Sequence, residues 1–169
     1  MDTEVLKKLQ TPLKEKYREK PNAAWVTLKA EGKIGEGVTC TIDNGRMLIE
    51  AGLHPATGGS GLLACSGNML LEALVACAGV TLRAVSTAIG VELRNATIHA
   101  EGDLDFRGTL GIAKDVPVGF KAIRLWFNLD TDASEEQIAT LQNLTERFCV
   151  LYQTLDKGVS VKTNMKKSE

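Results

Sequence analysis

A chain of 169 residues is long enough to bury one ordinary hydrophobic core, and hydrophobic residues at 44% with charged residues at 24% are typical of a soluble globular protein. Because 20 Lys and Arg balance 21 Asp and Glu, the net charge of -1 provides no overall field that would recruit nucleic acid or an anionic membrane. The first ten residues, MDTEVLKKLQ, lack the apolar segment of a secretory signal, so we expect a cytoplasmic protein whose four cysteines do not form structural disulfides.

The first 20 residues predict an amphipathic helical arm. Apolar residues recur in this segment at helical spacing among many charges, and the pattern is interrupted by Pro12 and stopped before Pro21. The apolar positions are Leu6, Leu9, Leu13 and Tyr17. We therefore expect residues 1–20 to lie as an arm on another surface, and residues 21–169 to form a single α+β domain.

Residues 24–50 predict a three-stranded antiparallel meander. Three short alternating runs, WVTLKAEG, VTCTI and RMLIE, are separated by glycines and by a DNG turn, in which Asn44 and Gly45 favour a tight hairpin. The segment GLHPATGGSG that follows contains four glycines but lacks the lysine and the spacing of a phosphate-binding loop. It indicates a mobile connection.

Residues 68–89 predict the central helix, which Gly90 ends. The apolar stretch from Leu62 to Val80 is long enough to span a bilayer, but it contains polar residues near its start. We interpret it as a loop that leads into a buried helix, and expect no membrane segment.

The second half of the chain predicts two strands, a helix and a last strand. Residues 93–104 and 121–130 alternate in the manner of strands and are expected to pair across the loop between them. Ser134 and Gln137 form a capping box at the start of a helix that reaches Cys149, which lies at its end or at the start of another helix. The run GVSVKT predicts a closing strand, and the whole order indicates an α+β fold.

Two cysteines on different predicted helices are the strongest candidates for chemistry. Cys77 and Cys149 are 72 positions apart, and each lies on or beside the apolar stripe of its helix, so they would approach each other if the helices pack. A new helix that begins at Cys149 would also place its amide donors at the sulfur. The alternative is that both thiols only fill space, since free cysteine is among the most buried residue types.

Other catalytic and metal sites have less support. The two histidines, His54 and His99, are far apart in the chain and no nucleophile elbow accompanies them. The cysteines include no CxxC or CxxH pair, so we expect no metal and no cofactor. Cys40 and Cys65 have no charged neighbour that argues for activation, and we interpret both as structural.

The motifs around both thiols resemble those of the OsmC/Ohr family of thiol-dependent hydroperoxide reductases. The resemblance rests on LLEALVACAGVTLRAV and RFCVLYQTL, with EGDLDFRGTLG and GFKAIRLWFNLD between them. It implies an OsmC-like fold of antiparallel β-sheets with two central helices, intertwined as a homodimer. It also implies that Cys77 attacks a small organic hydroperoxide, that Cys149 resolves the sulfenic acid as a disulfide, and that a dithiol reductant restores both thiols.

The chain departs from the family pattern beside the first cysteine. Where family members have an Asn-Pro-Glu stretch leading into the helix, this chain has Ser66-Gly67-Asn68, so Glu72 becomes the nearest carboxylate. No arginine is evident in the preceding loop, where His54 is favoured over Arg46 as the positive partner of the thiolate. These departures support an alternative function, a non-catalytic OsmC-like dimer that binds a small apolar ligand.

Overall fold

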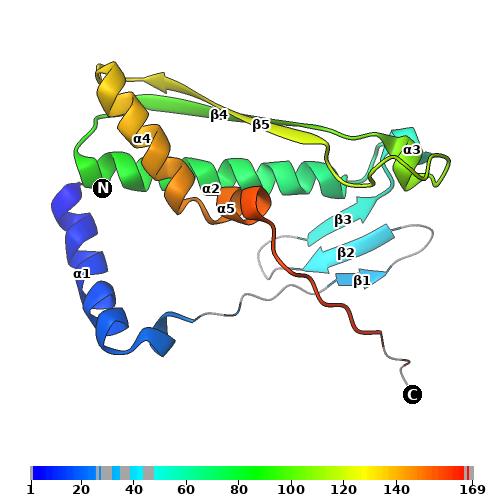
Figure 1. Ribbon diagram of the computed structural model, residues 1–169, viewed down its shortest axis with the longest axis horizontal. Coiled ribbons are helices and arrows are strands. Elements are labelled where there is room, and N and C mark those ends of the chain that lie inside the picture. The colour runs from blue at the N-terminus through cyan, green and yellow to red at the C-terminus, as the bar shows by residue number, and fades with distance from the viewer. Residues whose placement is uncertain are drawn as a thin grey trace.

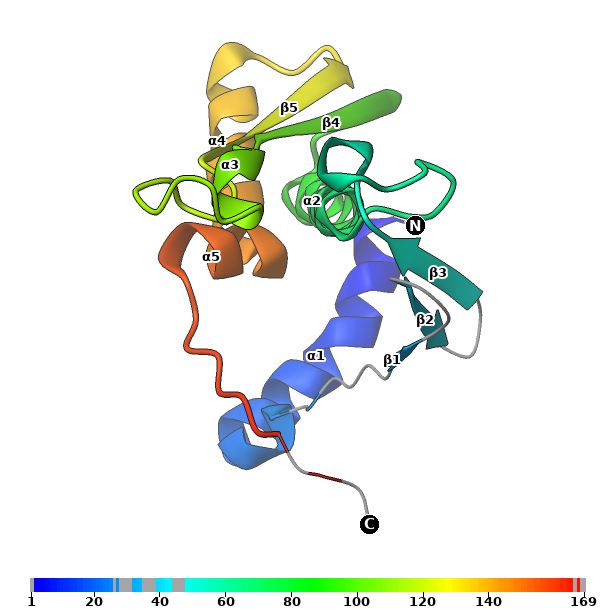
Figure 2. The same ribbon diagram turned by 90° about the vertical axis from the view of Figure 1, so that its right-hand side faces the viewer.

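The computed structural model describes residues 2–25, 27, 32–34, 39–43, 48–165 and 167, which form an α+β fold around one long helix. This helix, α2 (Ser66–Ile89), runs along the molecule below a hairpin of two long strands (Figure 1). Figure 2 looks along α2 and shows α4 (Glu135–Phe148) and α5 (Val150–Lys157) on one side of it and a three-stranded sheet on the other. The predicted class, antiparallel sheets with central helices, is confirmed.

Helix α2 is the predicted central helix, and it begins at Ser66 rather than at residue 68. It ends where Gly90 adopts a left-handed conformation with φ 73°, which glycine reaches without steric cost. Within the described part of the chain, α2 is one helix long and apolar enough to cross a membrane by length and composition. Core helices share these properties, and one face of α2 is indeed buried by Leu74, Ala78, Leu82, Val85 and Ser86.

The hairpin that covers α2 consists of β4 (Asn95–Asp103) and β5 (Ala122–Asp130), which pair antiparallel as predicted. Ile98 lies opposite Phe127, and both pack against the core, whereas the next pair along the strands is exposed. The hairpin approaches α2 closely at Gly79, where an added Cβ would lie 3.5 Å from the Ile98 Cδ1. The loop between the strands contains the short helix α3 (Phe106–Thr109).

Helix α4 completes the core. Its predicted capping box is confirmed: the Gln137 amide donates to the Ser134 Oγ at 3.3 Å, and the Ser134 amide donates to the Gln137 Oε1 at 2.9 Å. This start aims the apolar side of α4 at α2, and Leu141 becomes 1% exposed. The resulting cluster of buried residues contains Leu82, Val85, Val91, Leu93 and Leu141.

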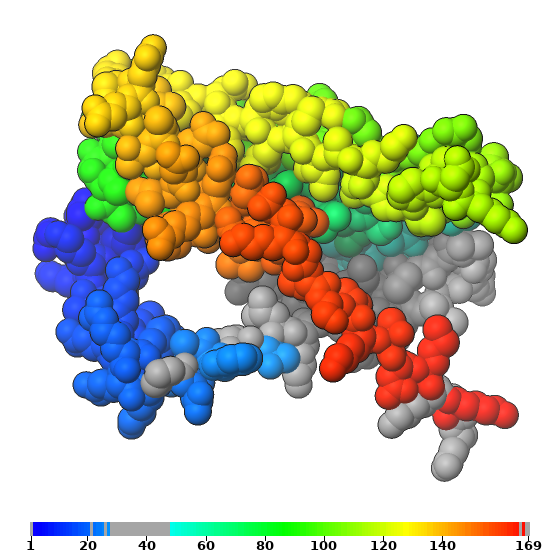
Figure 3. All heavy atoms as spheres, in the orientation of Figure 1, coloured from blue at the N-terminus to red at the C-terminus, as the bar shows by residue number. Residues whose placement is uncertain are grey.

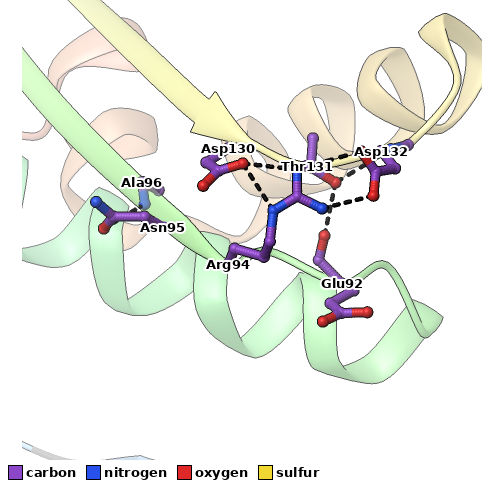
Figure 4. Close-up of polar contacts among 8 residues, drawn as sticks. Glu92, Arg94, Asn95, Ala96, Asp130, Thr131 and Asp132 are labelled. Carbon is purple, nitrogen blue, oxygen red and sulfur yellow. Dashed lines mark hydrogen bonds and ion pairs between the residues drawn. The ribbon is translucent and has the colours of Figure 1, made fainter.

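The open end of the hairpin is held by polar contacts around Arg94 (Figure 4). The Arg94 Nε donates to the Asp130 Oδ1 at 2.8 Å, and the same guanidinium donates to the Asp132 Oδ1 at 3.2 Å. The Thr131 hydroxyl donates to the Glu92 carbonyl at 2.6 Å. These contacts join the start of β4 to the end of β5 and to the segment that leads into α4.

The predicted meander is confirmed as an antiparallel sheet of β1 (Gly32–Ile34), β2 (Thr39–Asp43) and β3 (Leu48–Gly52), in the order β1-β2-β3. Gly32 is the residue of the predicted run WVTLKAEG that lies in β1, and residues 26 and 28–31 of that run lie outside the described residues. Residues Pro21–Ala24 form the 3-10 helix η1, and the described residues of β1 pair with three residues of β2. The hairpin predicted at Asn44 and Gly45 lies outside the described residues.

The N-terminal arm is α1 (Thr3–Glu19), and it continues through Pro12, so the predicted interruption is wrong. A proline removes one amide donor, and in this exposed segment water can serve the carbonyl that loses its partner. The Thr3 hydroxyl donates to the Thr87 carbonyl at 2.9 Å and so joins the first turn of α1 to α2. All residues of α1 are described and none is buried, so its apolar side stays uncovered.

The closing strand predicted at GVSVKT is also wrong. Residues 158–165, all within the described part of the chain, contain no strand. Gly158 ends α5 with φ 68°, and Val161 is 80% exposed. Alternating side chains alone do not make a strand, because the backbone also needs a neighbouring sheet edge to pair with.

Candidate functional site

Cys77 lies in the middle of α2, at the border between two apolar faces. The residue one turn before it, Leu74, and the next residue, Ala78, are buried in the core. On its other side lies an exposed strip that includes Ala73, Ala76 and Val80, the last of which is 72% exposed. The helix therefore holds the Cys77 side chain half-buried and accessible from one side.

Cys149 lies at the junction of α4 and α5, where it is both the last cap of the first helix and the first cap of the second. Its backbone is extended (φ -73°, ψ 110°), which separates the two helices. Its amide donates to the Thr145 carbonyl at 2.9 Å and its carbonyl accepts from the Gln153 amide at 3.0 Å. The residue is fixed on both sides and 1% exposed.

The structure brings these two side chains together. The Cys149 Sγ donates a hydrogen bond to the Cys77 Sγ across 3.5 Å, and both thiols are free. A disulfide has an S–S distance of about 2 Å, so a closure of roughly 1.5 Å would join the two sulfurs. The approach that the sequence made conditional on helix packing therefore occurs in the folded chain.

The surroundings of Cys77 favour its thiolate. Burial alone would raise the pKa of the Cys77 thiol, but hydrogen bonds from the Leu151 amide, the Cys149 thiol, the Val150 amide and the Thr81 hydroxyl outweigh it and lower the pKa. The two amides belong to the first turn of α5, whose positive dipole end points at the sulfur. All of these donors are electrically neutral.

The opposite holds for Cys149. Burial raises the pKa of its thiol, and the neighbouring Cys77 raises it further, more than the amides of Tyr152 and Leu151 lower it. Cys77 is therefore the first of the pair to lose its proton, while Cys149 stays protonated and donates to it. This arrangement supplies a nucleophilic sulfur next to a second thiol that can form a disulfide with it.

The structure does not bring the other two predicted site residues to the sulfurs. Glu72 is exposed and precedes Cys77 by five positions, which places it about 140° away around the helix. His54 precedes the 3-10 helix η2 (Pro55–Thr57), and its Nδ1 accepts from the Ala56 amide at 3.0 Å. Its ring stacks on Phe106 with the centroids 4.9 Å apart.

Two other basic residues were considered from the sequence. Arg46, the alternative to His54, lies outside the described residues. Arg83 is exposed on another side of α2 and donates to the Leu93 carbonyl at 2.8 Å. No cluster of three or more His, Cys, Asp or Glu side chains that could hold a metal occurs among the residues that the structure describes.

Part of the donor set at Cys77 was not predicted from the sequence. The expectation that amides of a new helix serve Cys149 is supported by the amides of Tyr152 and Leu151, but the sequence did not predict that the amides of Val150 and Leu151 also serve Cys77. Thr81 was not singled out either, although its position four residues after Cys77 places a hydroxyl on the same side of the helix. That spacing was the available signal.

A groove of about 1060 Å³ lies between β5 on one side and α4 and α5 on the other, and neither Cys77 nor Cys149 is among its lining residues. In Figure 3, green atoms of α2 are visible between the yellow atoms of β5 and the orange and red atoms of α5. Leu74, Thr145 and Tyr152 bring the groove next to the sulfur pair, because each is within one turn of Cys77 or Cys149. Most of its other walls are apolar, including Leu70, Ile123, Leu125, Phe127, Ile138 and Leu155.

Comparison with known proteins matches residues 59–164 to the model of the OsmC-like protein family. Among solved structures, the chain is similar to an OsmC-like protein from Mycoplasma pneumoniae, with 19% identity over 79% of this chain and 89% of that one and a TM-score of 0.65. It is also similar to an organic hydroperoxide resistance protein OsmC from Legionella pneumophila, with 18% identity over 82% and 96% of the two chains and a TM-score of 0.63.

A third similar structure is the organic hydroperoxide resistance protein OhrB of Bacillus subtilis, with 23% identity over 81% of this chain and 96% of that one and a TM-score of 0.56. At these identities the structural likeness shows the fold. No curated protein matches the chain by sequence. The family model covers both Cys77 and Cys149.

Proposed function

Because the chain belongs to the OsmC-like protein family, we propose that it is a thiol-dependent peroxidase that reduces organic hydroperoxides to alcohols. Cys77 is the attacking thiol and Cys149 the resolving thiol. The observation that carries the proposal is the 3.5 Å contact between the two sulfurs, in which the more acidic sulfur is the more accessible one. The family relation suggests a redox function linked to hydroperoxides, and the contact supplies chemistry for it.

The first step is attack of the Cys77 thiolate on the terminal oxygen of the hydroperoxide. An S–O bond forms, the O–O bond breaks, and the alkoxide that leaves takes up a proton to become the alcohol. Sulfur is oxidised to a sulfenic acid and the peroxide is reduced. The amides of Val150 and Leu151 hold the negative sulfur in place before the attack.

The second step forms the disulfide. The Cys149 thiol gives up its proton, its sulfur attacks the sulfur of Cys77, and hydroxide leaves and takes up that proton as water. Cys149 starts 3.5 Å away, so the closure needs little movement of the α4–α5 junction. An external dithiol then reduces the disulfide and is itself oxidised to a disulfide, without a metal or cofactor. A reducing compartment such as the cytoplasm supplies such dithiols.

The groove beside the thiols is suited to the organic part of the substrate. Its apolar walls would take an alkyl or aryl group out of water, and its lining residues Leu74, Thr145 and Tyr152 would hold that group within one helical turn of the two cysteines. The same groove is the feature that favours the alternative function, a binding protein for a small apolar ligand. The two functions differ in whether Cys77 reacts.

We further propose that the chain acts as a homodimer. The strip Ala73, Ala76 and Val80 lies exposed along the most apolar helix and borders Cys77. The apolar side of α1 is uncovered as well, with Leu9 at 57% exposed. A second copy that covers these surfaces would bury apolar area and exclude water from the accessible side of the thiol.

The test is oxidation of the reduced protein with one equivalent of cumene hydroperoxide, followed by peptide mass mapping. We expect a Cys77–Cys149 disulfide and a free thiol at Cys65. Cys77→Ser should abolish peroxide consumption, whereas the matched control Cys65→Ser should consume peroxide at the wild-type rate. If Cys77→Ser consumes peroxide as fast as the wild type, the peroxidase proposal is wrong and the binding function takes its place.

A further inference from the structure

Thr81 lies one helical turn after Cys77 on the same side of α2 and is partly buried. Its Oγ1 donates a hydrogen bond to the Cys77 carbonyl at 2.8 Å. A bond to the carbonyl four residues earlier is a common way for threonine to satisfy its hydroxyl within a helix. If Thr81 had only a structural role within the helix, this hydrogen bond would be sufficient to explain it.

The position four residues after Cys77 also places this hydroxyl beside the Cys77 side chain, and its proximity lowers the pKa of the thiol. A threonine hydroxyl has one hydrogen and rotates about its Cβ–Oγ bond, so it donates to one acceptor at a time. A neutral thiol is a weaker acceptor than a carbonyl, but a thiolate attracts the hydrogen through its charge. The preferred acceptor therefore changes when Cys77 ionises.

The other donors at Cys77 cannot make this change. The amides of Val150 and Leu151 are fixed in the first turn of α5. The Cys149 thiol donates across 3.5 Å in the reduced state, but it loses its proton and forms the disulfide in the resolving step. The Thr81 hydroxyl is the donor that can turn toward the sulfur and away from it again.

The charged side chains named below lie on other sides of α2 or along the groove, so the Cys77 sulfur is stabilised by neutral donors. Cys149 is the titratable group that contacts Cys77 from the α4–α5 junction. On α2 itself the neighbouring charges lie on other sides of the helix, and those of α4 and α5 line the groove near a tyrosine ring. These groups are Glu72 and Arg83 on α2, Glu146 on α4, and Tyr152 and Asp156 on α5.

We propose that Thr81 is a positioning residue whose hydroxyl moves its hydrogen bond from the Cys77 carbonyl to the Cys77 sulfur when the thiol ionises, and so increases the thiolate fraction at neutral pH. The inference rests on the proposed function only for its effect on turnover, because ionisation of Cys77 needs no peroxide. In the disulfide the sulfur carries no charge and the hydroxyl returns to the carbonyl.

The experiment compares the full-length wild type with Thr81→Val, which removes the hydroxyl at similar volume, and with Thr81→Ser, which keeps it. The rate of Cys77 alkylation by iodoacetamide is followed against pH by peptide mass. For Thr81→Val we expect a midpoint about one pH unit higher and roughly tenfold slower alkylation at neutral pH, as for loss of one hydrogen bond to a charged group. Thr81→Ser should stay within about twofold of the wild type.

The inference is overturned if Thr81→Val has the wild-type midpoint, or if Thr81→Ser shifts it as far as Thr81→Val does. Thr81→Ala carries the same expectation as Thr81→Val if the valine variant does not fold. Oxidation by cumene hydroperoxide, measured on the same proteins, separates the two proposals. If the protein is not a peroxidase, neither the wild type nor the Thr81 variants are oxidised, but their alkylation rates still differ. If Thr81 has no role at the sulfur, the wild type and the Thr81 variants are oxidised at the same rate at each pH.

Discussion

Replacing Cys149 in two ways separates its role as a resolving sulfur from its role as a hydrogen-bond donor to Cys77. Cys149→Ser removes the resolving sulfur but keeps a donor at the 3.5 Å contact. Cys149→Ala removes both. Neither change adds volume at a position that is 1% exposed, so neither should strain the junction of α4 and α5.

The size of the effect follows from the donor set at Cys77. A hydrogen bond to a charged group contributes about 1.5–3 kcal/mol, and a thiol is a weak donor, so we take the lower limit for Cys149. That free energy raises the pKa of Cys77 by about one unit, since one unit equals about 1.4 kcal/mol. Cys149→Ala should therefore slow the first oxidation of Cys77 roughly tenfold at neutral pH, and Cys149→Ser by less than about threefold.

The assay is a single turnover with cumene hydroperoxide, in which sulfenic acid at Cys77 is trapped with dimedone and quantified by mass. Both variants should accumulate the trapped adduct, because no second sulfur remains at the contact, whereas the wild type should yield the disulfide. The rates of the two variants should converge at alkaline pH, where Cys77 is fully ionised in each. Equal rates at neutral pH would refute the donor role, and rapid loss of the sulfenic acid in Cys149→Ser would refute the resolving role.

Three further predictions concern the Cys77 thiol, the hydrophobic core and the exposed strip of α2. The pH midpoint for alkylation of Cys77 should be lower in native protein than in urea-denatured protein, because folding lowers the pKa of this thiol. A higher midpoint in the native protein would contradict the donor arrangement at Cys77. Leu141→Ala should reduce the free energy of unfolding by about 3 kcal/mol in urea titrations, because Leu141 is 1% exposed within the core, and a loss below about 1 kcal/mol would argue against that packing. Val80→Asp should disrupt the proposed dimer, so that light scattering gives the mass of a monomer while the helical circular dichroism is unchanged, and a wild-type mass would argue against a dimer contact at Val80.

Local patterns in the sequence were sufficient for most secondary structure. The alternation in residues 93–104 and 121–130 predicted the hairpin β4–β5, and the capping box at Ser134 predicted the start of α4. These signals work because side-chain periodicity and cap chemistry act within a few residues. They failed at Pro12, where one missing amide did not stop an exposed helix, and at residues 158–163, where the alternation had no partner strand.

The sequence by itself determined that two thiols lie on or beside the apolar stripes of two helices, and the motifs around them indicated the family. Only the tertiary structure decided that Cys149 contacts Cys77, that the first amides of α5 serve the Cys77 sulfur, and that Glu72 and His54 are held elsewhere. The physical reason is that a thiol pKa depends on donors a few ångströms away, and here the packing of α5 against α2 sets those distances across 72 positions of chain.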